Sequence, residues 1–134
     1  MGALNMRTAL TLMSGAEEKA SDIGITIAVA VIDEGGNLMS FQRMDNTQLA
    51  SSLLAQNKAY SAVAFQRPSK DMFDVSQPGQ PGYALQDVDR RYVFAGGGMP
   101  IMIDGGIVGA VGVSGGTADQ DQECAEAALA SIRD

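Results

Sequence analysis

Two segments of this chain alternate large apolar residues with small or polar ones, and a glycine-rich turn interrupts each. In the first, residues 25–32 and 38–43 read as strands around the turn-forming residues 33–37. In the second, residues 100–104 and 107–113 flank Gly105 and Gly106. Two such hairpins restrict the chain to an antiparallel sheet, because strands joined by a short turn run in opposite directions. Gly109 and Gly112 interrupt the last strand, which indicates a bend or a close backbone approach.

The segments before and after the first hairpin have apolar residues at helical spacing. Residues 8–23 form the first predicted helix, and Gly24 follows where a left-handed C-cap is expected. Its predicted apolar face consists of Leu10, Met13, Ala20 and Ile23. Residues 48–65 form the second, with Asp45 or Thr47 as the N-cap. The predicted inner face of this second helix consists of Leu49, Leu53, Tyr60 and Val63.

The remaining elements complete an α/β chain of the α+β type. Thr117 and Gln120 form a capping box for a last helix that extends to about residue 132. Residues 69–75 are a predicted short helix, and residues 92–94 are a predicted short strand. We interpret residues 1–134 as one domain, because this length is about that of a typical domain and no segment has the composition of a linker between domains.

Composition excludes several classes of partner. Hydrophobic residues make up 46% of the chain, which is enough for a core without disulfides. The chain has 9 basic and 16 acidic residues and a formal charge of −7, so nucleic acid and anionic membranes are poor partners. One cysteine, no apolar run of membrane-spanning length and no signal-peptide pattern together predict a cytoplasmic protein.

The chain has no histidine. This excludes Ser-His-Asp and Cys-His nucleophilic schemes and nearly all zinc hydrolase sites. The single Cys124 lies in the last helix beside Glu123 and is interpreted as a packing residue. We therefore predict no catalytic residues and no metal site, and the sequence favours a binding protein over an enzyme.

The chain is rich in glycine, with 16 residues, several of which are in clusters. None of the clusters matches a phosphate-binding or dinucleotide-binding loop. The loop of Gly96, Gly97 and Gly98 and the segment Ser114, Gly115, Gly116 and Thr117 are the candidate ligand-binding loops. The second segment joins a strand to a helix N-terminus, where free amides and the helix dipole favour an anion. The alternative is a cap that only closes the helix.

Two isolated cations are candidates for binding a ligand carboxylate, namely Arg43 and Lys58. The alternative is an intramolecular ion pair, for example with Asp33 or Asp45. Most of the 8 methionines are expected to fill the core, and Met99, beside the triple glycine, is the candidate soft ligand.

Several ordered segments resemble one known family. They are residues 31–38, 41–45, 58–60, 96–101 and 108–117, and together they span most of the chain. They are similar to the GlcG/HbpS family of small accessory proteins and to the C-terminal part of PduO-type corrinoid adenosyltransferases. The resemblance implies a profilin-like fold with a five-stranded antiparallel sheet that carries helices, and it implies homo-oligomers that bind haem in several members.

Three functions follow as hypotheses. The first is an oligomeric accessory protein that binds a small ligand, haem or a corrinoid, in connection with diol, glycerol or glycolate utilisation. The second is an enzyme that acts on a small hydroxy acid or aldehyde, which the residues support least. The third is an oligomeric scaffold or chaperone for a corrinoid enzyme, with no ligand of its own. Without histidine, an oxygen or sulfur donor would have to ligate haem iron, or an axial position would stay open.

Overall fold

The computed structural model describes residues 3–133, and within them it forms three α-helices and four β-strands. The helices are α1 (Met6–Asp22), α2 (Leu49–Phe65) and α3 (Ala118–Ala130), and the strands are β1 (Ala28–Asp33), β2 (Leu38–Arg43), β3 (Gly98–Ile103) and β4 (Gly106–Ser114). All strand pairs are antiparallel, in the order β2-β1-β4-β3. The prediction of two hairpins in one antiparallel sheet is confirmed. Within residues 3–133, no helix has the length and apolarity needed to cross a membrane.

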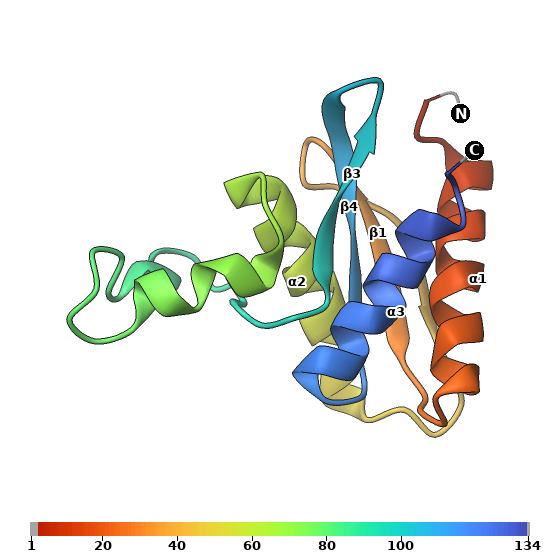
Figure 1. The fold of residues 1–134 in the computed structure, drawn as a ribbon, viewed down its shortest axis with the longest axis horizontal. Helices are drawn as coiled ribbons and strands as arrows, with labels where there is room; N and C mark the ends of the chain where they lie inside the picture. The colour runs from red at the N-terminus through yellow and green to blue at the C-terminus, as the bar shows by residue number, and fades with distance from the viewer. Residues whose placement is uncertain (1–2, 134) are drawn as a thin grey trace.

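The sheet separates two layers of different character (Figure 1). α1 and α3 cover one face and bury large side chains such as Leu12, Val29 and Val111 against it. α2 covers the other face, where the sheet presents mainly alanine and glycine. An alanine methyl at position 112 would overlap the backbone carbonyl of Ala55, so α2 lies directly on β4. The close backbone approach expected at Gly112 is therefore confirmed.

The predicted inner face of α2 is partly wrong. Leu49 is 81% exposed and Leu53 is 63% exposed, whereas Tyr60 and Val63 pack against a buried cluster. The residues that α2 buries are small or polar and include Ser51, Ala55, Lys58, Ala59, Ser61 and Ala62. The physical reason is the bare surface of β4, which leaves no room for leucine side chains between the helix and the strand.

The predicted fifth strand, residues 92–94, is also wrong, because the described sheet has four strands. Ser61 on α2 binds this segment instead: its Oγ accepts a hydrogen bond from Val93 N at 2.8 Å and donates one to Arg91 O at 3.2 Å. Tyr92 and Phe94 both pack against the Phe65 ring, at centroid distances of 4.9 and 5.4 Å. Side-chain hydrogen bonds and aromatic packing thus replace strand pairing.

Residues 70–90, here called the projecting arm, extend away from the helices and the sheet (Figure 1). The predicted short helix at 69–75 is instead a pair of 3₁₀ turns, η1 (Ser69–Met72) and η2 (Asp74–Ser76), and a third turn, η3 (Leu85–Val88), follows. The arm exposes Phe73, Tyr83 and Val88 by 51, 63 and 72% of their surface.

Capping was predicted correctly at two of the three helices. Gly24 has a φ of +79° after α1, and Thr117 and Gln120 form the complete capping box of α3. At α2 the prediction is wrong, because the N-cap is Gln48 and no side chain caps the helix. In α1, Leu10 is 46% exposed, since Ala9, Leu12 and Ala16 occupy the buried positions instead.

Candidate ligand-binding site

The loop of Gly96, Gly97 and Gly98 lies beside the two residues that flank the second candidate segment, Val113 and Ala118. The loop of Gly96, Gly97 and Gly98 is buried and runs beside the end of β4, where Val113 N donates to Gly97 O at 2.9 Å. Gly97 N donates to Gln122 Oε1 at 3.1 Å, and Gly98 N donates to Ser69 Oγ at 3.0 Å. Gly97 O is therefore bound by a backbone amide, and Gly97 N and Gly98 N are bound by side chains of the chain itself.

Lys58 is the centre of this arrangement. Lys58 is 4% exposed, and its Nζ lies 3.0 Å from Asp121 Oδ2 and 3.1 Å from Val113 O. The sequence left a ligand contact and an internal ion pair open, and the structure shows the ion pair. The partner is Asp121 on α3, rather than Asp33 or Asp45.

The Asp121 carboxylate also accepts a hydrogen bond from a backbone amide at the start of α3. Its Oδ1 accepts a hydrogen bond from Gly116 N at 2.8 Å, and Thr117 N donates to Gln120 Oε1 at 2.9 Å. A carboxylate thus lies at this helix N-terminus, as the dipole favours, and it belongs to the protein itself. Lys58, Asp121 and the two glycine loops form what we call the polar hub, which joins α2, α3 and β4.

The glycines of the hub are required by close contact within the chain. A Cβ at Gly96 would lie 2.6 Å from Ala118 O, and Gly97 has a φ of +125°. A Cβ at Gly98 would overlap the carbonyl of Lys58. These glycines therefore allow close contact between the backbone of the loop and the backbone of α2 and α3.

Arg43 and Met99 are not part of the hub. Arg43 is exposed at the end of β2, one edge of the sheet, whereas the Gly96–98 loop leads into β3 at the other edge. The Met99 sulfur lies 3.0 Å from Gln122 Nε2, which donates to it, and the side chain packs against the large core cluster. The structure therefore separates Arg43 from the other candidates and engages Met99 internally.

Sequence reasoning missed Ser69 and Gln122 as polar partners. It placed the Asp121 carboxylate at the N-terminus of the last helix, where the Gly116 amide donates to it, but missed Asp121 as the partner of Lys58. Asp121 and Gln122 were visible as polar residues in the first turns of α3, but nothing in the sequence links position 58 to position 121. The interpretation of Cys124 as a packing residue is confirmed, because it is fully buried. Burial, followed by the charges of Asp121 and Glu123, raises the pKa of its thiol to about 11. Across residues 3–133, no group of three or more Cys, Asp or Glu residues is placed to hold a metal ion.

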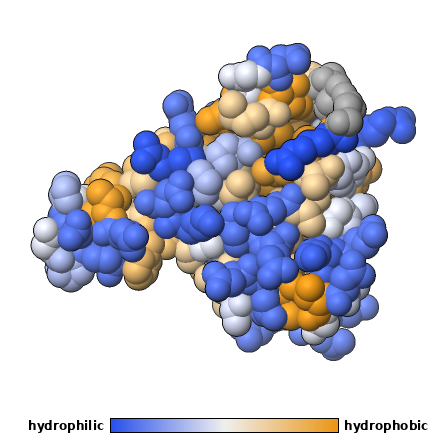
Figure 2. Space-filling view, in the orientation of Figure 1, coloured by the Kyte–Doolittle hydropathy of each residue, from blue (hydrophilic) through white to orange (hydrophobic). Residues whose placement is uncertain are grey.

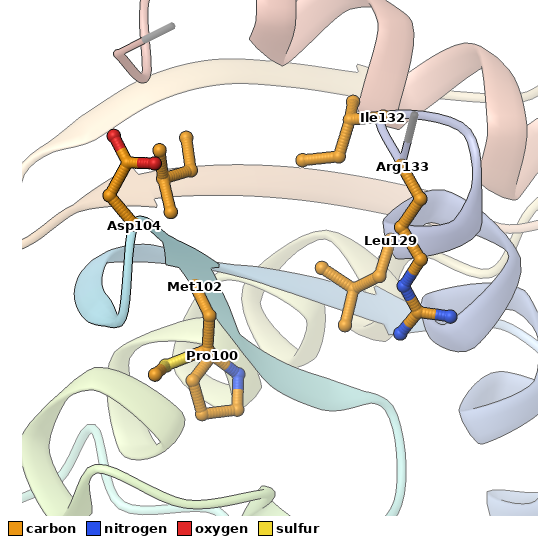
Figure 3. Close-up of a pocket in the computed structure, with 7 residues that line it drawn as sticks. Pro100, Met102, Asp104, Leu129, Ile132 and Arg133 are labelled. Carbon is orange, nitrogen blue, oxygen red and sulfur yellow. The ribbon is translucent and has the colours of Figure 1, made fainter. Parts of the chain in front are cut away.

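An open crevice lies apart from the hub, between β3 and the end of α3 (Figure 3). We call it the β3 crevice; its volume is about 440 Å³, and its lining residues are Pro100, Met102, Ile103, Asp104, Leu129, Ile132 and Arg133. A second hollow of about 560 Å³ lies beside the β1–β2 turn. The sequence drew attention to neither.

Fold and site together define a small α+β fold that has ligand-sized hollows and whose most conspicuous polar residues bind one another. The family model described as haem degrading protein HbpS-like matches residues 4–130, and the chain belongs to this family.

Individual relatives agree with this assignment. A 15.0 kDa protein from the dhaT-dhaS intergenic region of Citrobacter freundii is 38% identical over 130 residues, which cover 96% of this chain and 92% of that protein. The crystal structure of a PduOC:heme complex has a TM-score of 0.94 at 34% identity, covering 98% of this chain and 96% of that one. The corrinoid adenosyltransferase PduO of Salmonella typhimurium is 34% identical over 131 residues, and this chain covers 39% of its length.

Proposed function

We propose that this protein is an oligomeric accessory protein that binds a tetrapyrrole, with haem as the first candidate and a corrinoid as the second. The observation that carries the proposal is the similarity to the PduOC:heme complex, which extends over 98% of this chain. The proposed link to diol, glycerol or glycolate utilisation rests on the relatives. The proposed cytoplasmic location rests on the single cysteine, which is a buried free thiol.

The residues of the chain limit how haem could be held. Histidine is absent, Cys124 is buried with a raised thiol pKa, and Met99 already accepts a hydrogen bond. Lys58 is bound to Asp121, so it cannot also meet a propionate without breaking the hub. The donors that remain are exposed thioethers and phenols, which fit a weakly or openly ligated haem. Bound haem would supply redox chemistry; the chain's part would be to hold the ring and pair its carboxylates.

The projecting arm supports the homo-oligomer. It exposes three large apolar side chains, and the outer face of α2 exposes Leu49 and Leu53. Figure 2 shows apolar surface on the arm and over the β3–β4 hairpin. A short segment without a core of its own is stabilised when a second surface covers its apolar residues. We expect multi-angle light scattering at micromolar concentration to find a stable oligomer, and only monomer would contradict this part of the proposal.

Titration with hemin, followed by absorbance, tests the proposed ligand. A saturable Soret change with purified, tag-free protein is the expected result, without the low-spin spectrum typical of histidine ligation. A parallel titration with cobalamin tests the corrinoid.

The scaffold for a corrinoid enzyme is the second candidate function. The similarity to part of PduO favours it, because this chain matches 39% of the length of a protein named as a corrinoid adenosyltransferase. Saturation by neither hemin nor cobalamin, together with an oligomer in solution, would favour the scaffold. An enzyme acting on a small hydroxy acid or aldehyde is supported least, because the acidic and nucleophilic residues of the hub are engaged with one another.

A further inference from the structure

The outer face of α2 is apolar, whereas its buried residues are small or polar. The five most exposed residues of the helix are all apolar, namely Leu49, Ala50, Leu53, Leu54 and Ala64. Ser51, Lys58 and Ser61, in contrast, are buried. The three leucines lie within an arc of about 140° at 3.6 residues per turn, and we call them the leucine face. A surface helix normally turns its apolar side toward the core, so this arrangement indicates that another surface covers the leucine face.

The leucine face also lies on the one long helix that exposes no charge. Lys58 is the only charged residue of α2, and it is paired with Asp121 inside the protein. The other two helices expose several charges, which are Arg7, Glu18 and Asp22 on α1 and Asp119, Glu123 and Glu126 on α3. Two copies of a chain with a net charge of −7 repel each other, and the repulsion is smallest where the facing surfaces are uncharged. The charges therefore favour the α2 side as the place where a second copy binds.

The projecting arm is the second uncovered apolar surface on this side of the sheet. It leaves the molecule on the α2 side and points away from the helices (Figure 1). Phe73, Tyr83 and Val88 are exposed along it, and Figure 2 shows apolar surface there. Because the arm points away from its own α2, it leaves its own leucine face uncovered.

The base of the arm is fixed to the rest of the chain. Before the arm, Ser69 Oγ accepts a hydrogen bond from Gly98 N at 3.0 Å, and after it, Ser61 Oγ on α2 binds the segment that follows. Within the arm, Gly82 N donates to Val75 O at 2.8 Å. A projection held in this way loses little conformational entropy when a partner covers it, which favours binding.

The size of the two surfaces indicates that a stable contact uses both. α2 has 17 residues, so it is about 25 Å long and about 10 Å wide, and its outer face measures roughly 250 Å². A stable interface buries about 800 Å² on each partner. The outer face of α2 is about a third of this area, so a stable pair of copies also has to bury the arm.

We propose that two copies of this chain exchange their arms, so that the projecting arm of each copy packs on the leucine face of the other. Two-fold symmetry then makes the same contact twice, which doubles the buried area. Each copy supplies both halves of the contact, an apolar projection and an apolar helix face. This inference rests on the oligomer that forms part of the proposed function, and it names the interface of that oligomer.

Light scattering of charge-insertion variants tests the contact. Leu53→Glu alters the leucine face and Tyr83→Lys alters the arm; both residues are 63% exposed within one copy, so the single chain should still fold. We expect each variant to show at most half the molar mass of the wild-type assembly at the same micromolar concentration, because a charge without a partner opposes burial. Leu10→Glu is the control and should keep the wild-type mass, because Leu10 is 46% exposed on α1, on the other side of the sheet.

A second variant of each surface guards against a local effect of one substitution. Leu49→Glu on the leucine face and Val88→Lys on the arm replace residues that are 81 and 72% exposed, and both should lower the mass in the same way. Circular dichroism of each variant checks that the chain still folds.

An equimolar mixture of Leu53→Glu and Tyr83→Lys distinguishes arm exchange from other pairings. In a mixed pair, one contact joins two unchanged surfaces, and the other joins two altered surfaces of opposite charge. If α2 packed on α2 and arm on arm instead, every contact of the mixed pair would contain an altered surface. We therefore expect the mixture to regain the wild-type mass, with both variants present in the assembly by native mass spectrometry.

The possible failures are distinguishable. A wild-type protein that is monomeric would contradict the proposed oligomer and the arm exchange with it. A wild-type oligomer that the variants of both surfaces leave intact would overturn the arm exchange alone. Variants that dissociate singly and stay dissociated when mixed would show that the arm does not bind the leucine face of a second copy.

Discussion

The ion pair between Lys58 and Asp121 allows a quantitative test of the polar hub. The two residues are 4 and 2% exposed, and their charged atoms lie 3.0 Å apart. Replacing Lys58 with Met removes both hydrogen bonds of the ammonium and leaves the Asp121 carboxylate buried with the Gly116 amide as its remaining donor. Removing one partner of a buried pair costs about 3–5 kcal/mol, because the other charge is left uncompensated. Domains of this size have a total unfolding free energy of about 5–15 kcal/mol, so the loss would be large.

The assay is a double-mutant cycle with Lys58→Met and Asp121→Asn, measured by urea unfolding at a fixed protein concentration. Asp121→Asn retains an oxygen that can accept from Gly116 N. We expect the double variant to cost about as much as either single variant, which corresponds to a coupling energy of at least about 2 kcal/mol.

A surface pair provides the control for this cycle. Lys19 Nζ lies 4.0 Å from Glu123 Oε2, and the two side chains are 39 and 53% exposed. Lys19→Met should cost at most about 0.5 kcal/mol, because water and salt screen an exposed pair. Additive losses below about 1 kcal/mol for Lys58→Met and Asp121→Asn would refute the reasoning and show that water reaches the hub.

Three further predictions concern single groups. Gly112→Ala should lower the free energy of unfolding, measured in urea, by at least about 2 kcal/mol, because the new methyl would overlap the Ala55 carbonyl. Gly106→Ala is the control and should change it by no more than about 0.5 kcal/mol, because its new methyl would have its nearest neighbour at 3.9 Å. Equal losses in the two variants would contradict the close packing of α2 on β4. The pKa of Cys124 is raised to about 11, so a thiol reagent should react slowly with the native protein at pH 8 and rapidly only after denaturation, and fast native labelling would refute this. Hydrogen bonds from Arg91 lower the pKa of Asp89 to about 2, so their stabilising effect is present above the unfolded value of about 4 and is lost as the pH falls toward 2. A carbon NMR titration should move the Asp89 midpoint back toward about 4 in Arg91→Gln, and an unmoved midpoint would exclude Arg91 as the cause.

Local patterns in the sequence predicted the elements that local physics determines. The two hairpins, the capping box at Thr117 and the glycine after α1 depend on residues a few positions apart, and each was identified. The inner face of α2 was not, because the usual rule places leucine inside, whereas the Gly112 surface of β4 accepts only small residues. A helix face is decided by its partner surface as well as by its own side chains.

The candidate site was harder to predict for the same reason. The sequence identified Lys58 and the two glycine loops as unusual, and the structure brings them together. Their partner Asp121 lies 63 positions from Lys58 along the chain. No local spacing encodes such a contact, so a ligand contact and an internal pair could not be distinguished.

The direct seating of α2 on β4 has a consequence for how sequences of this fold can diverge. Gly112 meets the backbone of Ala55 and both the backbone and the methyl of Ala59, so these three positions share one fixed volume. A methylene gained at one of them needs a loss at another, so substitutions there are expected in compensating pairs. On the opposite face, Val29 and Val111 belong to a large core cluster that also holds leucine, isoleucine and methionine, where single exchanges among valine, isoleucine and leucine are expected to be absorbed by rotamer changes. The two faces of one sheet are thus expected to evolve under different rules.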